Sequence, residues 1–128
     1  MKANRLALRR LILHTARGVA NLGGVVETIK WGQPAYLPAR PRVGSTIRLG
    51  TMADPSTADA LFVHCQSTLV PTFRRLYGEE LEFVANRGMV LHRGQTMPRR
   101  ALAHGIELSL TYHWWKNAPS GPSIGSKR

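Results

Sequence analysis

The sequence predicts a two-layer α+β domain, in which helices near the two ends of the chain cover one face of an antiparallel sheet. Apolar residues recur at helical spacing in residues 5–17, and a second helical pattern starts at Thr96-Met97-Pro98. The runs between them are short, rich in β-branched and aromatic residues, and joined by turns too tight for helical crossovers. Such connections favour antiparallel neighbours over parallel ones.

The first helix is predicted over residues 5–17, with Leu8, Leu11 and Ile12 on its apolar face. At about 100° per residue, the basic side chains are expected on the other side. They include Arg5, Arg9, Arg10 and Arg17. Gly18 and then Gly23-Gly24 end this helix.

Short strands are expected through the middle of the chain. They span residues 25–30, 46–49, 60–66, 81–85 and 89–93, with loops at 38–42 and 50–56. The first strand ends at Trp31–Tyr36, where Gly32 and Pro34 impose a turn or bulge.

Two further local signals complete the predicted order of elements. Ser67 or Thr68 can cap a short helix that has Pro71 in its first turn and stops at Gly78. Asn86-Arg87-Gly88 then joins the last two strands as a hairpin. In the C-terminal helix, Leu102, Ile106, Leu110 and His113 are predicted to share one face.

Length and composition predict one domain over residues 1–116 and a flexible tail rich in Ser, Gly and Pro over residues 117–128. The hydrophobic share of 43% is enough for an independent core. Cys65 is the only cysteine, so no intramolecular disulfide forms. No secretory signal and no window of about 20 apolar residues is visible, so we expect a reducing, cytoplasmic location without a membrane span.

The charge balance is strongly basic, with 18 Lys and Arg against 7 acids and a formal net charge of +11. No acid precedes Glu27. This excess favours anionic partners such as nucleic acid, acidic proteins or phosphorylated ligands, although a positive surface can also serve solubility alone. One hypothesis is therefore nucleic-acid binding, specific or non-specific, through Arg5, Arg9, Arg10 and Arg17.

The stretch from Val25 to Tyr36 resembles the signature of the YdhG-like domains, small bacterial proteins of mostly unknown function. The resemblance rests on Glu27, an aliphatic residue, Trp31-Gly32-x-Pro34 and Tyr36. It extends over about residues 5–116, because Gly88–His92, Met97-Pro98, Leu102 and Ile106 are similar to the family's last strand, turn and helix. It implies a frataxin-like fold with helices on one face of an antiparallel sheet, and some relatives are described as iron chaperones.

Iron handling of that type needs clustered surface carboxylates, because oxygen ligands suit a hard cation. The sequence departs from this pattern, since its N-terminal helix carries no acid and its only acidic cluster is Glu79, Glu80 and Glu82. None of the five histidines has a recognised metal-ligand spacing, although His64 and His92 could meet across strands. The identity of any metal or cofactor therefore stays unknown.

The candidate ligand surface is the bend from Trp31 to Tyr36, where two aromatics flank a Gly-Pro element beside Gln33. Arg48 and His64 would line it further if their strands adjoin. The alternative is a structural bend whose aromatics fill the core. Cys65 has no catalytic partners and is expected to be a small buried hydrophobe, and no catalytic motif is present. The sequence therefore predicts a non-enzymatic binding or adaptor domain for an unknown small ligand or acidic partner.

Overall fold

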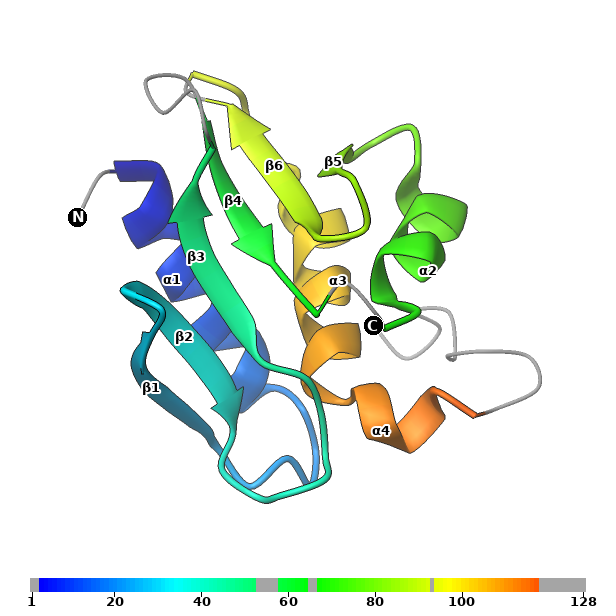
Figure 1. Cartoon of the computed structure of the whole chain (residues 1–128). Helices are drawn as coiled ribbons and strands as arrows, with labels where there is room; N and C mark the ends of the chain where they lie inside the picture. The colour runs from blue at the N-terminus through cyan, green and yellow to red at the C-terminus, as the bar shows by residue number, and fades with distance from the viewer. Residues whose placement is uncertain (1–2, 53–57, 65–66, 93, 118–128) are drawn as a thin grey trace.

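A computed structural model of the protein contains six strands in one antiparallel sheet and four helices (Figure 1). The structure describes residues 3–52, 58–64, 67–92 and 94–117. In chain order the elements are α1 (Ala3–Arg17), β1 (Val25–Lys30), β2 (Gln33–Pro38), β3 (Ile47–Thr51), β4 (Ala58–Phe62), α2 (Leu69–Tyr77), β5 (Glu82–Val84), β6 (Gly88–His92), α3 (Arg99–Leu110) and α4 (Tyr112–Trp115). The strands lie in the order β1-β2-β3-β4-β6-β5, and every neighbouring pair is antiparallel. The predicted α+β class with an antiparallel sheet is therefore confirmed.

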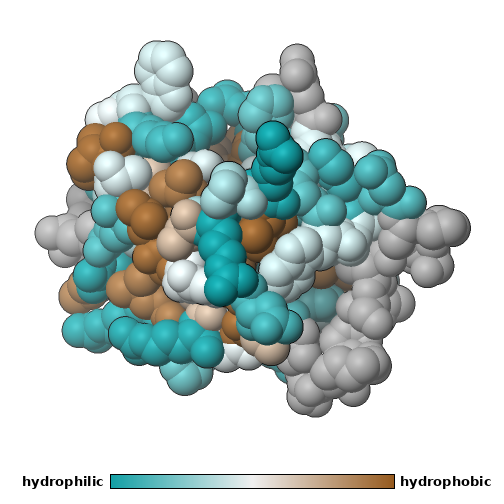
Figure 2. Space-filling model, turned by 90° about the horizontal axis from the view of Figure 1, so that it is seen from below, coloured by the Kyte–Doolittle hydropathy of each residue, from teal (hydrophilic) through white to brown (hydrophobic). Residues whose placement is uncertain are grey.

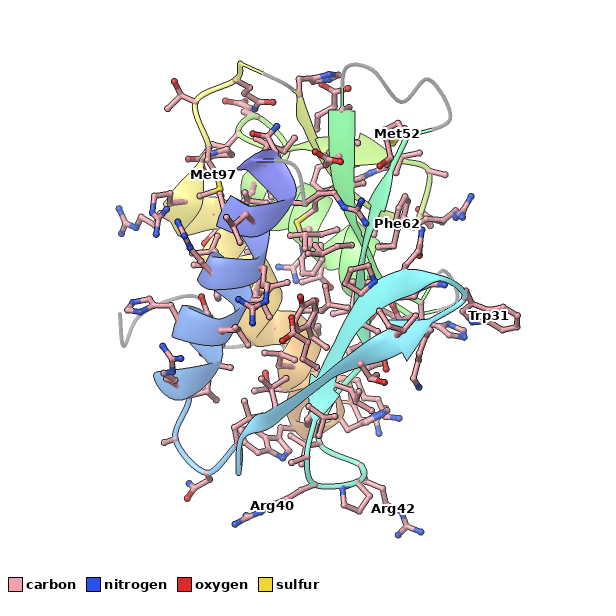
Figure 3. The ribbon with its side chains drawn as sticks, turned by 90° about the vertical axis from the view of Figure 1, so that its left-hand side faces the viewer. Trp31, Arg40, Arg42, Met52, Phe62 and Met97 are labelled. Atoms are coloured by element: carbon pink, nitrogen blue, oxygen red, sulfur yellow. The ribbon has the colours of Figure 1, made fainter. Side chains whose placement is uncertain are left out.

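Helices α1 and α3 pack against each other and against the same side of the sheet (Figure 3). Alternation along the strands points Tyr36, Ile47, Leu49, Leu61 and Met89 toward these helices, and all of them are buried. Leu8, Ile12, Leu102 and Ile106 meet them from the helices. Burial of these apolar side chains is the main stabilising term of the fold.

In the part of the chain that the structure describes, no helix packs across the opposite face of the sheet (Figure 3). Arg48 of β3 lies there, with Ala35 of β2 and Phe62 of β4 directly opposite it in the register. Gly50 belongs to the same face, because a Cβ at this position would meet the side chains of Gln33 and Phe62. We call this surface the open face.

The hairpin β1–β2 differs from the predicted bend. Only Trp31 and Gly32 form the turn, and both have positive φ, 55° and 74° respectively. Residues 33–38 continue as a strand, so the prediction that the whole segment from Trp31 to Tyr36 is a bend is wrong. Pro34 and Pro38 are tolerated because β3 pairs only with Ala35 and Tyr36, so neither proline has to donate a hydrogen bond to that strand.

Several other boundaries move by a few residues. Strand β4 begins at Ala58 and ends at Phe62, earlier than predicted, while β3 extends to Thr51 into the expected loop. The β5–β6 hairpin and the helices α2 and α3 are confirmed. His113 does not continue the apolar face of α3, because that helix ends at Leu110 and His113 is exposed in α4. Cys65 and the predicted tail from residue 118 lie outside the described residues.

Seen from below, apolar side chains gather on the left of Figure 2, the side of α1 and β1 in Figure 1. Among the described residues, the large hydrophobic ones that stay exposed are Val26, Ile29, Trp31 and Trp114. In the part of the chain that the structure describes, no helix has the length and apolar character needed to cross a membrane.

Candidate functional site

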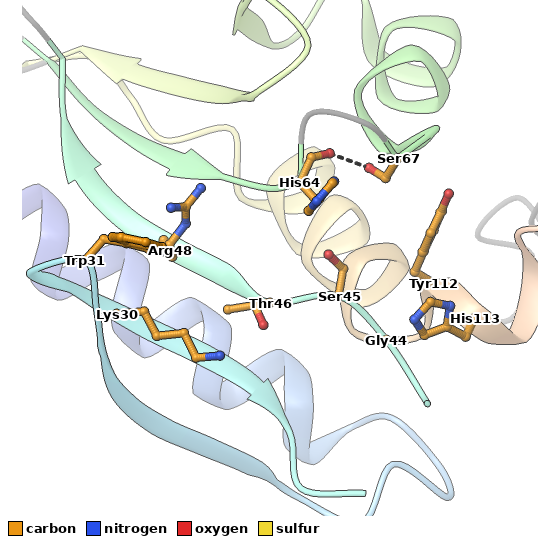
Figure 4. Close-up of a pocket in the computed structure, with 10 residues that line it drawn as sticks. All are labelled: Lys30, Trp31, Gly44, Ser45, Thr46, Arg48, His64, Ser67, Tyr112 and His113. Carbon is orange, nitrogen blue, oxygen red and sulfur yellow. Dashed lines mark hydrogen bonds between the residues drawn. The ribbon is translucent and has the colours of Figure 1, made fainter. Parts of the chain in front are cut away.

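A pocket of about 640 Å³ opens between the β1–β2 turn, the open face of β3 and helix α4 (Figure 4). Its lining residues are Lys30, Trp31, Gly44, Ser45, Thr46, Arg48, His64, Ser67, Tyr112 and His113. This volume lies within the range of about 300–1,000 Å³ found for small-ligand sites. We call it the basic pocket.

The β1–β2 turn places Trp31 at the rim of the basic pocket. A two-residue hairpin loop with positive φ at both positions is normally made from Asn and Gly, because a Cβ is disfavoured there. Gly32 fits this requirement, whereas Trp31 is a bulky residue with a φ of 55°. Its side chain is also 88% exposed, so packing within the protein does not explain the strained conformation. Strain of this kind is concentrated at functional sites.

Strand pairing places the two strongly basic side chains of the pocket. Arg48 stands on the open face between Ala35 and Phe62 of the neighbouring strands. Lys30 is the last residue of β1 and pairs with Gln33 across the turn. In Figure 4 the Lys30 and Arg48 side chains extend from the same side of the pocket as Trp31, and His64, Tyr112 and His113 lie on the other side.

The second wall is held by backbone contacts between distant segments. The Ser45 N–H donates to the Ser109 carbonyl at 2.8 Å, and the His113 N–H donates to the Val43 carbonyl at 2.9 Å. Gly44 passes so close to α3 that a Cβ there would lie 1.9 Å from the Leu110 carbonyl oxygen. These contacts fix the loop that carries Ser45 and Thr46 against the ends of α3 and α4.

Helix α4 is anchored in turn by its aromatic residues. The Trp115 Nε1–H donates to the Leu108 carbonyl at 3.0 Å, and the Tyr112 hydroxyl accepts from the Thr68 N–H at 3.1 Å. The Ser67 hydroxyl donates to the His64 carbonyl at 2.7 Å (Figure 4). The wall that faces Lys30 and Arg48 is therefore preorganised and carries several hydroxyl groups.

The electrostatic character of the basic pocket is positive. Lys30 and Arg48 are basic side chains, and none of the described residues that line the pocket is acidic. Partial desolvation of the ring, and to a smaller extent the charge of Lys116, lowers the pKa of His113 below its usual value of 6.5, which favours a neutral imidazole that can donate or accept a hydrogen bond. Cationic and hydroxyl donors around one cavity can bind a phosphate or a carboxylate.

The predicted ligand residues do not all reach this pocket. Trp31, Arg48 and His64 line it together. Gln33 lies beside it on the open face, whereas Tyr36 is fully buried on the helix side and donates to Glu27 at 2.6 Å. The inclusion of Tyr36 was wrong because residues three apart on a strand point to opposite faces, so Gln33 and Tyr36 cannot share a surface.

The arginines of α1 do not form one outward surface. Arg9 binds Glu27 through two hydrogen bonds of 2.6 and 3.0 Å, and Arg5 is half-buried with its Nε lacking a partner. Of the predicted set, only Arg10 and Arg17 are exposed. The prediction that all these arginines face away from the apolar stripe is wrong, because Arg5 lies three residues before Leu8 and shares its side of the helix.

The bonds from Arg9, and then from Tyr36, lower the pKa of Glu27 below its usual value of 4.5. Burial is the main cause that raises the pKa of the Tyr36 hydroxyl, with the bond to Glu27 second. Arg9, Glu27 and Tyr36 thus form one ionic cluster that joins α1 to the β1–β2 hairpin.

The described carboxylates do not converge around Glu79, Glu80 and Glu82. Among the described residues, no group of three or more His, Cys, Asp or Glu side chains is placed to hold a metal ion. Glu79 and Glu80 are exposed, and Glu82 instead accepts from His92 at 2.8 Å. His64 lies beyond the C-terminal end of β4, whereas His92 pairs with Ala58 at its start, so the two histidines do not meet.

Several pocket residues were missed by sequence reasoning. Lys30 adjoins Trp31 and could have been included once the turn was recognised as a two-residue hairpin. Ser45, Thr46, Tyr112 and His113 carry no local signal, because only the packing of α4 against the loop before β3 brings them together. Comparison of the chain with protein-family models, with curated proteins and with solved structures finds no match.

Proposed function

We propose that this protein is a non-enzymatic binding domain whose basic pocket takes a small anionic ligand that carries a planar ring. The observation that carries the proposal is the convergence of Lys30 and Arg48 on a cavity of about 640 Å³ whose described lining residues include no acid. The hydroxyl groups of the opposite wall supply further donors to a phosphate or carboxylate.

The preference for an anion follows from the charges that the fold leaves unneutralised. Within the described ranges, Arg9 forms an ion pair with Glu27 and His92 is hydrogen-bonded to Glu82, and neither contact involves Lys30 or Arg48. Two cations that share a cavity repel each other, and a bound anion removes that repulsion. A charge-assisted hydrogen bond contributes about 1.5–3 kcal/mol, roughly twice as much as a neutral one.

The preference for a planar ring follows from Trp31. Its indole is exposed and its backbone is strained, so the residue contributes little to the stability of the free protein. The face of an indole at the rim of a positively charged pocket is a stacking surface for a heteroaromatic ring.

The contacts of Ser67 favour binding over catalysis. Its hydroxyl donates to the His64 carbonyl and accepts from the Leu69 N–H at 3.3 Å, so the hydroxyl proton is directed to the backbone and not to an imidazole. An activated nucleophile requires a base within hydrogen-bond reach of that proton.

The proposal is tested with AMP as a probe that joins phosphate to a planar ring, and with adenosine as the uncharged comparison. We expect titration calorimetry to show tighter binding of AMP, and Arg48→Gln to weaken it by about tenfold or more, in line with the loss of a charge-assisted bond. Arg10→Gln is the matched control, because it removes the same charge from an exposed site on α1.

NMR spectra locate the site independently of affinity. We expect AMP and inorganic phosphate to shift the backbone signals of residues 30–31 and 44–48. Equal AMP affinity in the wild type and Arg48→Gln, or shifts confined to other surfaces, would contradict the proposal.

We also propose that the chain is a YdhG-like domain with a frataxin-like fold. The sequence from Glu27 to Tyr36 supports this, and so does the packing of α1 and α3 on one face of the antiparallel sheet. An experimental structure with either helix away from that face would contradict it. The iron-chaperone role of some relatives is not part of the proposal, since Glu79, Glu80 and Glu82 do not converge.

A further inference from the structure

A second, smaller pocket of about 320 Å³ lies on the open face. Its lining residues are Gln33, Arg48, Thr51, Met52, Phe62, Val84 and Arg87. Arg48 also lines the basic pocket, so the two cavities meet at this side chain. Met52 and Phe62 lie on the side of the sheet away from α1, where Trp31 projects as well (Figure 3).

Strand register shows how the two pockets are aligned. Arg48 of β3 lies opposite Phe62 of β4, Phe62 lies opposite Gly88 of β6, and Gly88 lies opposite Val84 of β5. These residues form one row across the strands on the open face. Arg87 directly precedes Gly88 in the sequence. The backbone of Arg87 is therefore about two inter-strand spacings from the backbone of Arg48, or about 10 Å at roughly 4.8 Å per spacing.

The row combines cations with aromatic rings. The Arg87 guanidinium lies 5.6 Å from the centre of the Phe62 ring, and the Arg87 side chain is exposed. Among the described residues that line the two pockets, none is acidic. Lys30, Arg48 and Arg87 therefore supply positive charge along one path that begins at the Trp31 indole.

We propose that the two pockets form one groove that binds a single-stranded nucleic acid across the strands of the open face. This inference rests on the proposed function, because the basic pocket would hold one nucleotide of the chain. One phosphate of the nucleic acid would lie at Lys30 and Arg48 and another at Arg87, and one base would stack on Trp31. Spaced cations with exposed aromatic faces are the features by which proteins bind single strands without strong sequence preference.

Two features favour this occupant over an acidic peptide or a duplex. Trp31 offers a stacking surface that a carboxylate side chain does not use, and every base has a ring that can use it. A duplex keeps its bases stacked inside the helix, whereas the bases of a single strand are free to stack on the exposed Trp31 indole. The net charge of +11 adds long-range attraction for a polyanion.

The test measures fluorescence anisotropy with three labelled probes. They are a single-stranded DNA of eight thymidine nucleotides, a single-stranded RNA of the same length, and a DNA duplex. We expect the single strands to bind more tightly than AMP or the duplex. Arg87→Gln should weaken binding of the single strands by about five- to tenfold and reduce the slope of log affinity against log salt by about 0.7, the value for one phosphate contact. Arg87→Gln should leave the AMP affinity unchanged.

Two further variants serve as controls. Arg10→Gln, which removes a charge from the other side of the molecule, should change affinity by less than about twofold. Arg87→Lys retains the charge and should restore most of the affinity. Thermal unfolding of each variant verifies the fold.

The outcomes separate the inference from the proposed function. The groove would be overturned if Arg87→Gln and Arg10→Gln weakened binding of the single strand equally. It would also be overturned if the single-stranded octamer bound no more tightly than AMP, if the duplex bound as tightly as the single strand, or if a poly-glutamate peptide bound more tightly than it. In all of these cases AMP binding that depends on Arg48 would leave the proposed function standing. Loss of that dependence would overturn both.

Discussion

Replacing Trp31 with Asn separates the stability of the hairpin from its function. The backbone φ of 55° costs a bulky residue about 1–2 kcal/mol, whereas Asn before Gly is a preferred hairpin turn. Against this gain stands the loss of indole burial. With the side chain 88% exposed, only about 30 Å² is buried, worth roughly 0.8 kcal/mol at 25 cal/mol/Å². We expect Trp31→Asn to be neutral or to stabilise the fold by about 0.5 kcal/mol.

Binding should change in the opposite direction. Stacking of a base on an aromatic side chain contributes about 1–3 kcal/mol, so the AMP affinity of Trp31→Asn should fall by about five- to 150-fold. Urea unfolding measures the change in stability, and titration calorimetry measures the change in AMP affinity. Trp31→Phe is the control, because it retains an aromatic ring and the strained backbone. Destabilisation of Trp31→Asn by more than about 1 kcal/mol, or unchanged affinity, would refute the reasoning.

Three further predictions concern the clusters that hold the site. Tyr36→Phe removes the 2.6 Å bond to Glu27 and should lower the free energy of unfolding by about 1 kcal/mol in urea; an unchanged midpoint would contradict it. Because the pKa of Glu27 is lowered in the fold, its stabilising effect is complete above its usual pKa of 4.5 and is lost as pH falls through the folded value. The stability difference between wild type and Glu27→Gln should therefore shrink between pH 7 and pH 3, and a constant difference would count against this. Gly44→Ala places a Cβ against the Leu110 carbonyl and should destabilise by about 3 kcal/mol, whereas Gly18→Ala, with 3.5 Å to its nearest atom, should change little in thermal unfolding.

Local sequence patterns were sufficient for most of the helices and strands, but not for β2 or α4. The apolar spacing of Leu8, Leu11 and Ile12 predicted α1, and Asn86–Gly88 predicted the β5–β6 hairpin. The same patterns could not predict β2, because two prolines in six residues argue against a strand unless one side of it is largely unpaired. That condition depends on the length of β3 and cannot be read from β2 itself.

The site was predictable only where neighbouring strands determine it. Arg48 was expected near the Trp31 turn on the condition that their strands adjoin, and the β2–β3 register meets that condition. Tyr36 could have been excluded from strand alternation alone once the turn was confined to Trp31 and Gly32. The contribution of Tyr112 and His113 depends on how α4 packs, which no local pattern encodes.

The backbone hydrogen bonds between the loop before β3 and the ends of α3 and α4 determine when the basic pocket forms during folding. One wall is supplied by Lys30, Trp31 and Arg48, and the other includes Tyr112 and His113 from much later in the chain, so neither wall encloses a cavity without the other. A folding intermediate with its sheet formed but its last helices undocked would therefore have no affinity for ligand. Ligand binding would then report that the C-terminal helices have docked, and ligand present during folding would stabilise only the completed state.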